Sequence, residues 1–233
     1  MRDLRSARFY SGSMKALSFS LEADSSLLQC CGCLGYAQIS TPSPQTVGFQ
    51  VMTQVIFLYG RPGVGKLTVG ELLAAETGYR LLHNHAVVDL VTSLFSFGSP
   101  PFVALRERIW LQAIDAALWA KSSGVIMTFA PEATVTDEFI PKLTSRIKEK
   151  GSSIHFIELR CSDEALETRI SADSRERYGK LRDVYKYRKL DAAGTFDRPK
   201  MPEPELVVDT TEQLPLEAAR TIVKHLRARA PAL

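Results

Sequence analysis

The sequence carries little net charge, few cysteines and no apolar run longer than a β-strand. Its 29 Lys and Arg residues and 26 Asp and Glu residues leave a net charge of +3, which is too small to indicate a nucleic-acid-binding surface. Apolar runs of strand length exclude a transmembrane helix, so neither nucleic acid nor a membrane is an expected partner. The 233 residues are 45% hydrophobic and 24% charged, a composition typical of one globular domain, with or without an appendage.

The four cysteines give little sign of a metal site. Three of them lie together at Cys30, Cys31 and Cys33, and Cys161 stands alone. A structural zinc site needs a second pair of ligands at finger-like spacing, which this sequence lacks. Metal ligands therefore stay unassigned, and a reduced, cytoplasmic protein is the simpler interpretation.

Residues 1–51 differ from the rest of the chain, because they are rich in serine and show no sustained hydrophobic period. One interpretation is an upstream extension of a protein that naturally begins at Met52. A second is an organellar presequence, which the scattered basic residues and serines fit and the acidic residues do not. A third, which we favour least, is a folded cap. We prefer the first, and expect a poorly ordered extension over residues 1–51 and one folded domain over residues 52–233.

The most informative segment follows a strand-like apolar run and precedes a helical pattern. It reads G-x-x-x-x-G-K, the body of a phosphate-binding P-loop, and in this context a Gly-rich turn without a ligand is the weaker interpretation. Backbone N–H groups and the helix N-terminus attract phosphate, and Lys66 supplies a cation for the β- and γ-phosphates. The predicted nucleotide-binding residues of the loop are Gly60, Arg61, Pro62, Gly63, Val64, Gly65, Lys66, Leu67 and Thr68.

The motif departs from its usual form directly after the lysine, where a Ser or Thr hydroxyl normally binds Mg²⁺. Leu67 occupies this place, and the hydroxyl comes one residue later, at Thr68. One residue corresponds to a rotation of about 100° on a helix, so we expect Thr68 to point away from the metal. Phosphate binding should survive this change, whereas direct metal binding is weakened.

From Met52 onward, predicted strands alternate with predicted helices. This order predicts an α/β fold in which right-handed crossovers join the strands of a parallel sheet, with ligands at the carboxyl ends of the strands. The expected strands are 54–59, 79–82, 124–129, 154–159 and 205–208, and the expected helices are 66–77, 86–95, 102–122, 136–150, 163 onward and 216–229.

From residue 55 to residue 226 the chain resembles the small P-loop kinases, such as shikimate, gluconate and nucleoside monophosphate kinases and chloramphenicol phosphotransferase. It shares most with uncharacterised predicted kinases or ATPases that have a Gly-Lys-Leu-Thr P-loop and an Asn-His pair after the second strand. The resemblance implies a P-loop NTPase three-layer sandwich with a five-stranded parallel sheet and a lid at about residues 170–190. It also implies ATP as the cofactor, with Mg²⁺ carried mainly by the nucleotide.

In the resembled kinases the end of the second strand faces the acceptor and often carries an aspartate that acts as base or holds metal. That place here holds His83, Asn84 and His85, with Asp89 one helical turn on. The resemblance therefore implies that these residues contact the acceptor, with His85 or Asp89 as a candidate base. A neutral imidazole near its ordinary pKa of about 6.5 can accept a hydroxyl proton. The alternative is that one histidine caps a strand, the other packs, and Asp89 only begins a helix.

An acidic metal ligand is hard to find at the end of the strand predicted at residues 124–129. Glu132 lies beyond the strand and could reach a metal through water, although a loop glutamate in solvent is the slightly preferred interpretation. Together with Leu67, this predicts that Mg²⁺ enters mainly with the nucleotide, because Mg²⁺ keeps several waters and uses few protein ligands.

A charged segment after the fourth predicted strand corresponds to the lid of the resembled kinases, whose arginines close on the transferred phosphoryl group. These positions imply catalytic roles for Arg169 and Arg175, followed by Arg177 and Lys180. The alternative is a solvated helix with paired Glu and Arg side chains.

The last predicted strand leads into Asp209, Thr210 and Thr211, which in the resembled kinases lie beside the adenine base. We expect the backbone groups of these residues to touch the base, or else only to form a capping loop before the final helix.

Together these features predict an ATP-binding phosphotransferase that moves the γ-phosphoryl group of ATP to a small hydroxylated or phosphorylated acceptor, as a monomer or homodimer. The rivals are a nucleotide-binding module without turnover, and an ATP hydrolase with water as the acceptor. Four aromatic residues in the acceptor segment could indicate an apolar or aromatic acceptor, although packing in the core is the commoner role of such residues. These four are Phe95, Phe97, Phe102 and Trp110.

Overall fold

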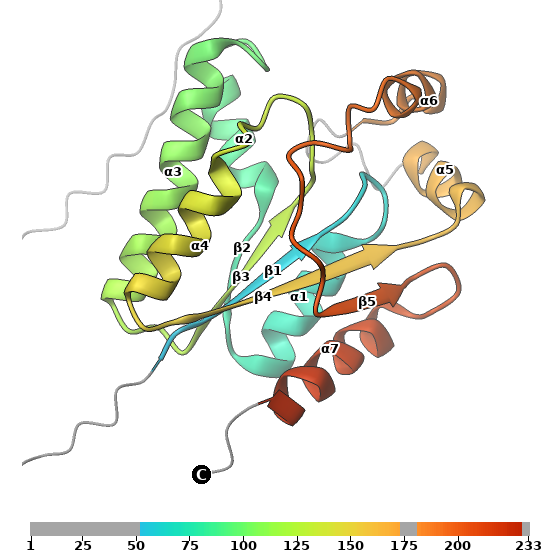
Figure 1. Ribbon diagram of the computed structural model, residues 1–233. Helices are drawn as coiled ribbons and strands as arrows, with labels where there is room; N and C mark the ends of the chain where they lie inside the picture. The colour runs from blue at the N-terminus through green and yellow to red at the C-terminus, as the bar shows by residue number, and fades with distance from the viewer. Residues whose placement is uncertain (1–51, 173–180, 230–233) are drawn as a thin grey trace, which may run out of the picture. The chain divides into compact units, whose positions relative to one another are not determined.

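The computed structural model describes residues 52–172 and 181–229. The predicted extension at residues 1–51 and the lid residues Arg175, Arg177 and Lys180 therefore lie outside the described part of the chain. Within that part, strands and helices alternate (Figure 1). The elements are β1 (Gln54–Tyr59), α1 (Lys66–Thr77), β2 (Arg80–Leu82), α2 (Asn84–Thr92), α3 (Pro100–Trp119), β3 (Gly124–Phe129), α4 (Phe139–Glu149), β4 (Ser153–Arg160), α5 (Asp163–Ser171), α6 (Val184–Ala192), β5 (Leu206–Asp209) and α7 (Pro215–Arg229).

The strands of the described chain form one parallel sheet with the order β2-β3-β1-β4-β5. β1 lies at its centre, and its residues Gln54–Tyr59 pair with Gly124–Phe129 of β3 and with residues 153–158 of β4. Parallel strands need crossover connections, and at least one helix supplies each of them. The predicted α/β fold with a five-stranded parallel sheet is confirmed.

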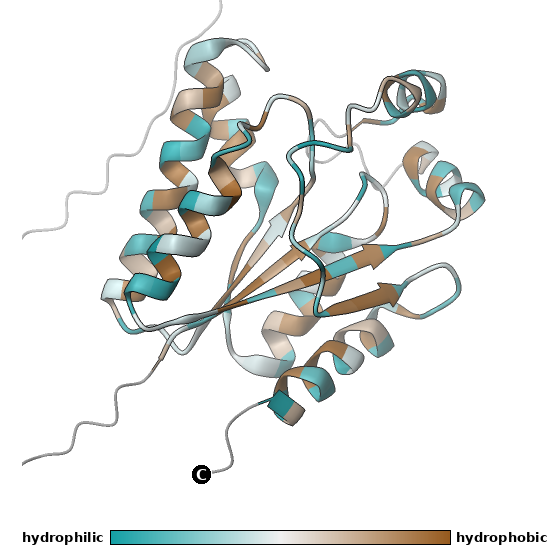
Figure 2. Cartoon of the chain, viewed as in Figure 1, coloured by the Kyte–Doolittle hydropathy of each residue, from teal (hydrophilic) through white to brown (hydrophobic). Residues whose placement is uncertain are grey.

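The side chains of β1 alternate between two cores, because successive residues of a strand point to opposite faces. Val55, Phe57 and Tyr59 belong to the core that includes α2, α3 and α4. Ile56 and Leu58 belong to the core that includes α1, α5 and α7. Figure 1 shows α3 and α4 on one face of the sheet and α1 and α7 on the other, and the strands between them are mostly apolar (Figure 2). The result is the predicted three-layer sandwich.

Two helices, α2 and α6, differ most from the sequence prediction, and the ends of α3 and α4 shift by up to three residues. α6 was not predicted, because Tyr187 is its only buried residue and no apolar period marks it. The helix expected at residues 86–95 begins instead at Asn84, because His83 is its N-cap and accepts a hydrogen bond from the Ala86 N–H through Nδ1 at 3.2 Å. No helix among the described residues has both the length and the apolar character needed to cross a bilayer.

Candidate functional site

The P-loop leaves β1 at the carboxyl edge of the sheet and leads directly into α1. Gly60, Gly63 and Gly65 have φ angles of 148°, 100° and 94°, a region that side chains disfavour. Gly60 also passes close to β4, since a Cβ atom there would lie 2.3 Å from the backbone oxygen of Leu159. The course of the loop therefore requires glycine at this position. Such a turn lets successive N–H groups face one concave site, as phosphate binding needs.

The N-terminus of α1 is open toward a possible anion. Its N-cap is Gly65, so no side chain satisfies the free N–H groups of the first turn. A Cβ atom at Gly65 would meet no atom within 4 Å, so open space lies beside that backbone. The ammonium of Lys66 donates to the backbone oxygens of Gly60 at 2.7 Å and Arg61 at 2.8 Å, which holds the cation over the loop. These groups fit the phosphates of a nucleotide.

The side chains near the loop fit a directly bound Mg²⁺ less well. Leu67 is half-buried and offers no ligand atom, and Thr68 beside it is exposed. At the end of β3, the buried hydroxyl of Thr128 accepts a hydrogen bond from the Asn84 N–H at 3.0 Å. No group of three or more His, Cys, Asp or Glu in the described chain is arranged to hold a metal ion. The loop thus offers phosphate ligands and few metal ligands of its own.

The residues predicted to face the acceptor lie where β2 passes into α2. His83 caps a helix and not a strand, and its Nδ1 accepts the Ala86 hydrogen bond, which leaves the proton of a neutral ring on Nε2. The side-chain oxygen of Asn84 is buried and has no hydrogen-bond partner in the described chain. A buried acceptor without a donor is costly, and a donor from a ligand or water would satisfy it. His85 follows at the first turn of α2, and Asp89 is exposed farther along the helix.

Glu132 is mostly buried and engaged in an ion pair, so the structure contradicts the interpretation of a loop glutamate in solvent. Its carboxylate accepts hydrogen bonds from the guanidinium of Arg106 and, at 2.6 Å, from the hydroxyl of Thr134. Arg106 comes from α3 and is fully buried, with its guanidinium 4.9 Å from the ring centre of Phe102 and 4.8 Å from that of Trp110. Burial lowers the pKa of Arg106, and the charge of Glu132 opposes that shift. The pair ties the loop after β3 to α3.

The four aromatic residues of the acceptor segment divide between core and surface. Phe102 and Trp110 are buried in the core, and Phe95 packs partly buried against the same cluster. The side chain of Phe97 is 56% exposed, with its ring centre 4.9 Å from that of Phe102. Core packing therefore accounts for most of this aromatic cluster.

Thr210 joins three segments at the carboxyl edge of the sheet. Its buried hydroxyl lies 3.0 Å from the backbone oxygens of Val64 in the P-loop and of Arg160 at the end of β4. Its backbone N–H donates to the Arg160 oxygen at 2.8 Å, and Arg169 of α5 donates to both its hydroxyl and its backbone oxygen. Both backbone groups of Thr210 are therefore engaged within the protein. The structure brings this predicted base-binding residue directly against the P-loop.

The neighbours of Thr210 differ in how they are held. Arg169 also donates to the backbone oxygen of Thr211 at 3.3 Å, so its guanidinium is bound to the loop after β5. Asp209 is exposed, and its carboxylate accepts a hydrogen bond from the Thr211 N–H at 2.7 Å. Hydrogen bonding from Thr211 holds the pKa of Asp209 below its usual range. Arg169 is thus placed beside the segment expected to meet the base.

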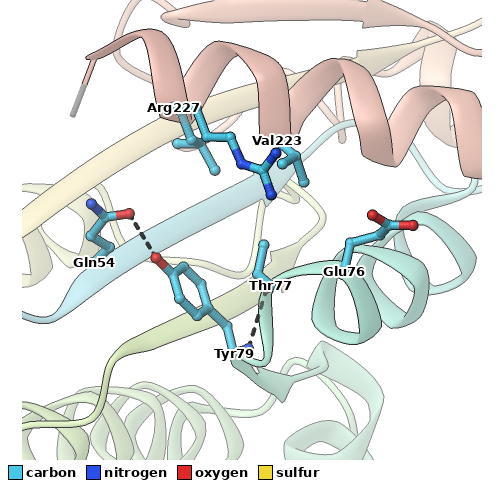
Figure 3. Close-up of a pocket in the computed structure, with 7 residues that line it drawn as sticks. Gln54, Glu76, Thr77, Tyr79, Val223 and Arg227 are labelled. Carbon is cyan, nitrogen blue, oxygen red and sulfur yellow. Dashed lines mark hydrogen bonds between the residues drawn. The ribbon is translucent and has the colours of Figure 1, made fainter.

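A separate pocket of about 230 Å³ lies at the other end of the sheet (Figure 3). β1 begins there at Gln54, whose side-chain oxygen accepts a hydrogen bond from the hydroxyl of Tyr79 at 2.9 Å. Ligands of parallel sheets bind at the carboxyl ends of the strands, so this pocket is not part of the candidate site. The residues that line it include Gln54, Glu76, Thr77, Tyr79, Val223 and Arg227.

Arg106 and Thr128 also shape the carboxyl edge of the sheet, and neither was predicted from the sequence. Arg106 stands four residues after Phe102 and four before Trp110, so all three lie on one face of α3. An arginine within the apolar stripe of a helix is a signal that could have identified a buried, paired cation. Thr128 gives no comparable signal, because its partner depends on the turn that follows β2.

No protein-family model and no curated protein matches this chain. Solved structures do match it. An APS kinase from Mycobacterium tuberculosis, solved with AMPPNP and APS, aligns with a TM-score of 0.52 and 18% identity over 76% of this chain and 98% of that chain. An unliganded sugar kinase from a Janibacter species aligns with a TM-score of 0.51 and 18% identity, covering 76% of this chain and 96% of that chain.

A gluconokinase from Sinorhizobium meliloti aligns with a TM-score of 0.50 and 22% identity, covering 78% of this chain and 94% of that chain. Identities this low establish the likeness of fold alone. The chain therefore has the fold of the small P-loop kinases, as its sequence predicted.

Proposed function

We propose that the chain is an ATP-dependent phosphotransferase that moves the γ-phosphoryl group of ATP to a small hydroxylated or phosphorylated acceptor. The observation that carries the proposal is the loop of residues 60–66, in which three glycines adopt positive φ angles and Lys66 is held over the loop oxygens. This loop precedes a helix N-terminus without a side-chain cap. The names of the similar structures, a sugar kinase, a gluconokinase and an APS kinase, support transfer to a small molecule.

In this proposal the loop N–H groups and Lys66 bind the phosphates, and the segment of Asp209 and Thr210 adjoins the base. Arg175 acts from the lid on the transferred group, where guanidinium groups stabilise developing negative charge. Arg169, whose guanidinium is bound to Thr210 and Thr211, holds the loop beside the base.

On the acceptor side, His83, Asn84 and His85 orient the substrate, and His85 or Asp89 takes the hydroxyl proton. Mg²⁺ bound to the nucleotide would neutralise phosphate charge there, since the described residues offer it few ligands.

A second candidate function is a nucleotide-binding module, or a slow ATPase without a dedicated acceptor. Leu67 in place of a metal-binding hydroxyl favours it, as does the engagement of Glu132 by Arg106. Formation of ADP that depends on an added acceptor supports the phosphotransferase. Phosphate release without any acceptor supports the ATPase, and tight binding without either supports the module.

The first experiment is calorimetric titration of the full chain with ATP, with and without Mg²⁺, beside a Lys66→Ala variant. A charged hydrogen bond contributes roughly 1.5–3 kcal/mol, so we expect the variant to bind ATP about 10- to 100-fold more weakly. Lys142→Ala is the matched control, because Lys142 is an exposed lysine on α4. Absence of ATP binding, or equal loss in both variants, would sink the proposal.

A further inference from the structure

An acidic residue of α6 forms an ion pair with an arginine of the P-loop. The Nη1 atom of Arg61 lies 3.2 Å from Oδ2 of Asp191, 130 residues farther along the chain. The two side chains are 42% and 28% exposed, so the pair is partly shielded from solvent. It joins the phosphate loop to the last turn of α6, a helix that overlaps the end of the predicted lid.

Arg61 lies at the end of the loop where the terminal phosphates of a nucleotide would bind. The lysine of a P-loop reaches the β- and γ-phosphates, so the ammonium of Lys66 marks their position. That ammonium is 2.8 Å from the backbone oxygen of Arg61. The backbone of Arg61 therefore lies close to this position, and its guanidinium matches phosphate oxygens in a two-pronged geometry.

Tyr187, close to Arg61, can serve as an alternative hydrogen-bond donor to Asp191. Tyr187 lies one helical turn before Asp191 on α6, and its side chain is 3% exposed. The Oδ1 atom of Asp191 is buried without a hydrogen-bond partner in the described chain, and the buried Tyr187 hydroxyl interacts with Arg61. Burial, with the charge of Asp191, raises the pKa of Tyr187 above its ordinary value of 10.0, at which the hydroxyl is already a neutral donor at physiological pH. Asp163 of α5 adds a second negative charge that acts on Arg61.

We propose that Arg61 binds the terminal phosphates of a nucleoside triphosphate, and that Asp191 competes with these phosphates for its guanidinium. The inference rests on the proposed function, because it concerns the same phosphate site. When a triphosphate binds, Arg61 leaves Asp191, and the carboxylate accepts the Tyr187 hydroxyl instead. A diphosphate brings less negative charge to this end of the loop. Arg61 therefore favours ATP over ADP, Asp191 lessens that preference, and the pair couples the P-loop to α6.

The test is calorimetric titration of the full chain with ATP and with ADP, using Asp191→Asn, Arg61→Gln and the double variant. Removal of the competing carboxylate should tighten ATP binding about 3- to 10-fold and change ADP binding less. Arg61→Gln should weaken ATP binding about 10-fold and reduce the preference for ATP over ADP. In the Arg61→Gln background, the gain from Asp191→Asn should shrink, because no guanidinium remains to be released.

Asp115→Asn is the matched control, since Asp115 pairs with Arg146 between α3 and α4 and is 34% exposed. It should leave both affinities unchanged. Unchanged or weaker ATP binding by Asp191→Asn, beside normal binding by the unmodified chain, overturns the inference and leaves the proposed function standing. Equal gains with and without Arg61 also overturn it, because Asp191 then only repels phosphate. Failure of the unmodified chain to bind ATP sinks the proposed function, and the inference with it.

Discussion

At the scale of single residues, buried polar side chains position the loops of the candidate site. The hydroxyl of Thr210 links the P-loop to the end of β4, and the hydroxyl of Thr128 holds the first N–H group of α2. Both lie where the strands end, so the backbone groups there need partners other than a neighbouring strand. A short side chain that both donates and accepts hydrogen bonds meets this need without filling the space expected for a ligand.

Tyr59, the last residue of β1, gives the protein a predictable sensitivity to alkaline pH. Burial, helped by the negative charge of Glu158, raises the pKa of Tyr59 from 10.0 to about 12. Between these values the phenol is neutral in the folded chain and ionised in the unfolded chain. Tyr59 therefore does not lower the free energy of unfolding below pH 10. As the pH rises toward 12, the free energy of unfolding falls by roughly 2–3 kcal/mol in all, because only the unfolded chain ionises.

We expect Tyr59→Phe to lose less of its free energy of unfolding between pH 10 and 11.5 than the unmodified chain. Denaturant titrations at several pH values in this interval measure the difference. Tyr185→Phe is the control, because Tyr185 is 76% exposed on α6 and should leave the slope with pH unchanged. If the free energy of unfolding falls equally with pH in all three proteins, Tyr59 ionises alike in the folded and unfolded chain, and the prediction is wrong.

At the scale of elements, the ion pair between Arg106 and Glu132 fixes α3 to the loop after β3. Arg106 is inaccessible to solvent, so loss of its carboxylate would leave a buried charge without compensation. Breaking a buried pair in this way costs about 3–5 kcal/mol. Glu132→Ala should lower the free energy of unfolding by about this amount in urea titrations.

The same helix offers an exposed acid for comparison, since Asp115 pairs with Arg146 of α4. Exposed pairs contribute roughly 0–1 kcal/mol, so Asp115→Ala should cost no more than that. Similar small losses in the two variants would mean that Arg106 finds hydration or another partner when Glu132 is removed.

The sequence predicted most elements because each has its own local pattern. β1 and β3 are unbroken apolar runs, and their burial on both faces of the sheet makes such runs necessary. α6 was missed because it buries only Tyr187, so its place depends on a few tertiary contacts and not on a periodic face. The start of α2 was misplaced because a histidine served as its N-cap, a role that Ser, Thr, Asp and Asn usually fill.

At the scale of the whole molecule, the P-loop could be predicted from the sequence, whereas the ion pairs around it could not. The P-loop is contiguous, so its glycines and Lys66 are recognisable from spacing alone. The partners of its neighbourhood are distant in sequence: Arg106 and Glu132 are separated by 26 residues, and Arg61 and Asp191 by 130. Pairs of this kind arise from the packing of several elements, and one sequence without the fold contains no signal that joins them.

A nucleotide that binds only the folded chain must raise the stability of the whole molecule. At an ATP concentration 100 times the dissociation constant, the stabilisation is about 2.7 kcal/mol. For a chain of this length that corresponds to roughly 5–10 °C in the temperature of unfolding. We expect a shift of this size with ATP in a calorimetric melt of the full chain, and a much smaller shift with Lys66→Ala. Adenosine is the ligand control, because without phosphates it cannot use the loop. An equal shift with adenosine would place the stabilising contacts outside the P-loop and contradict the assignment of that loop as the main binding element.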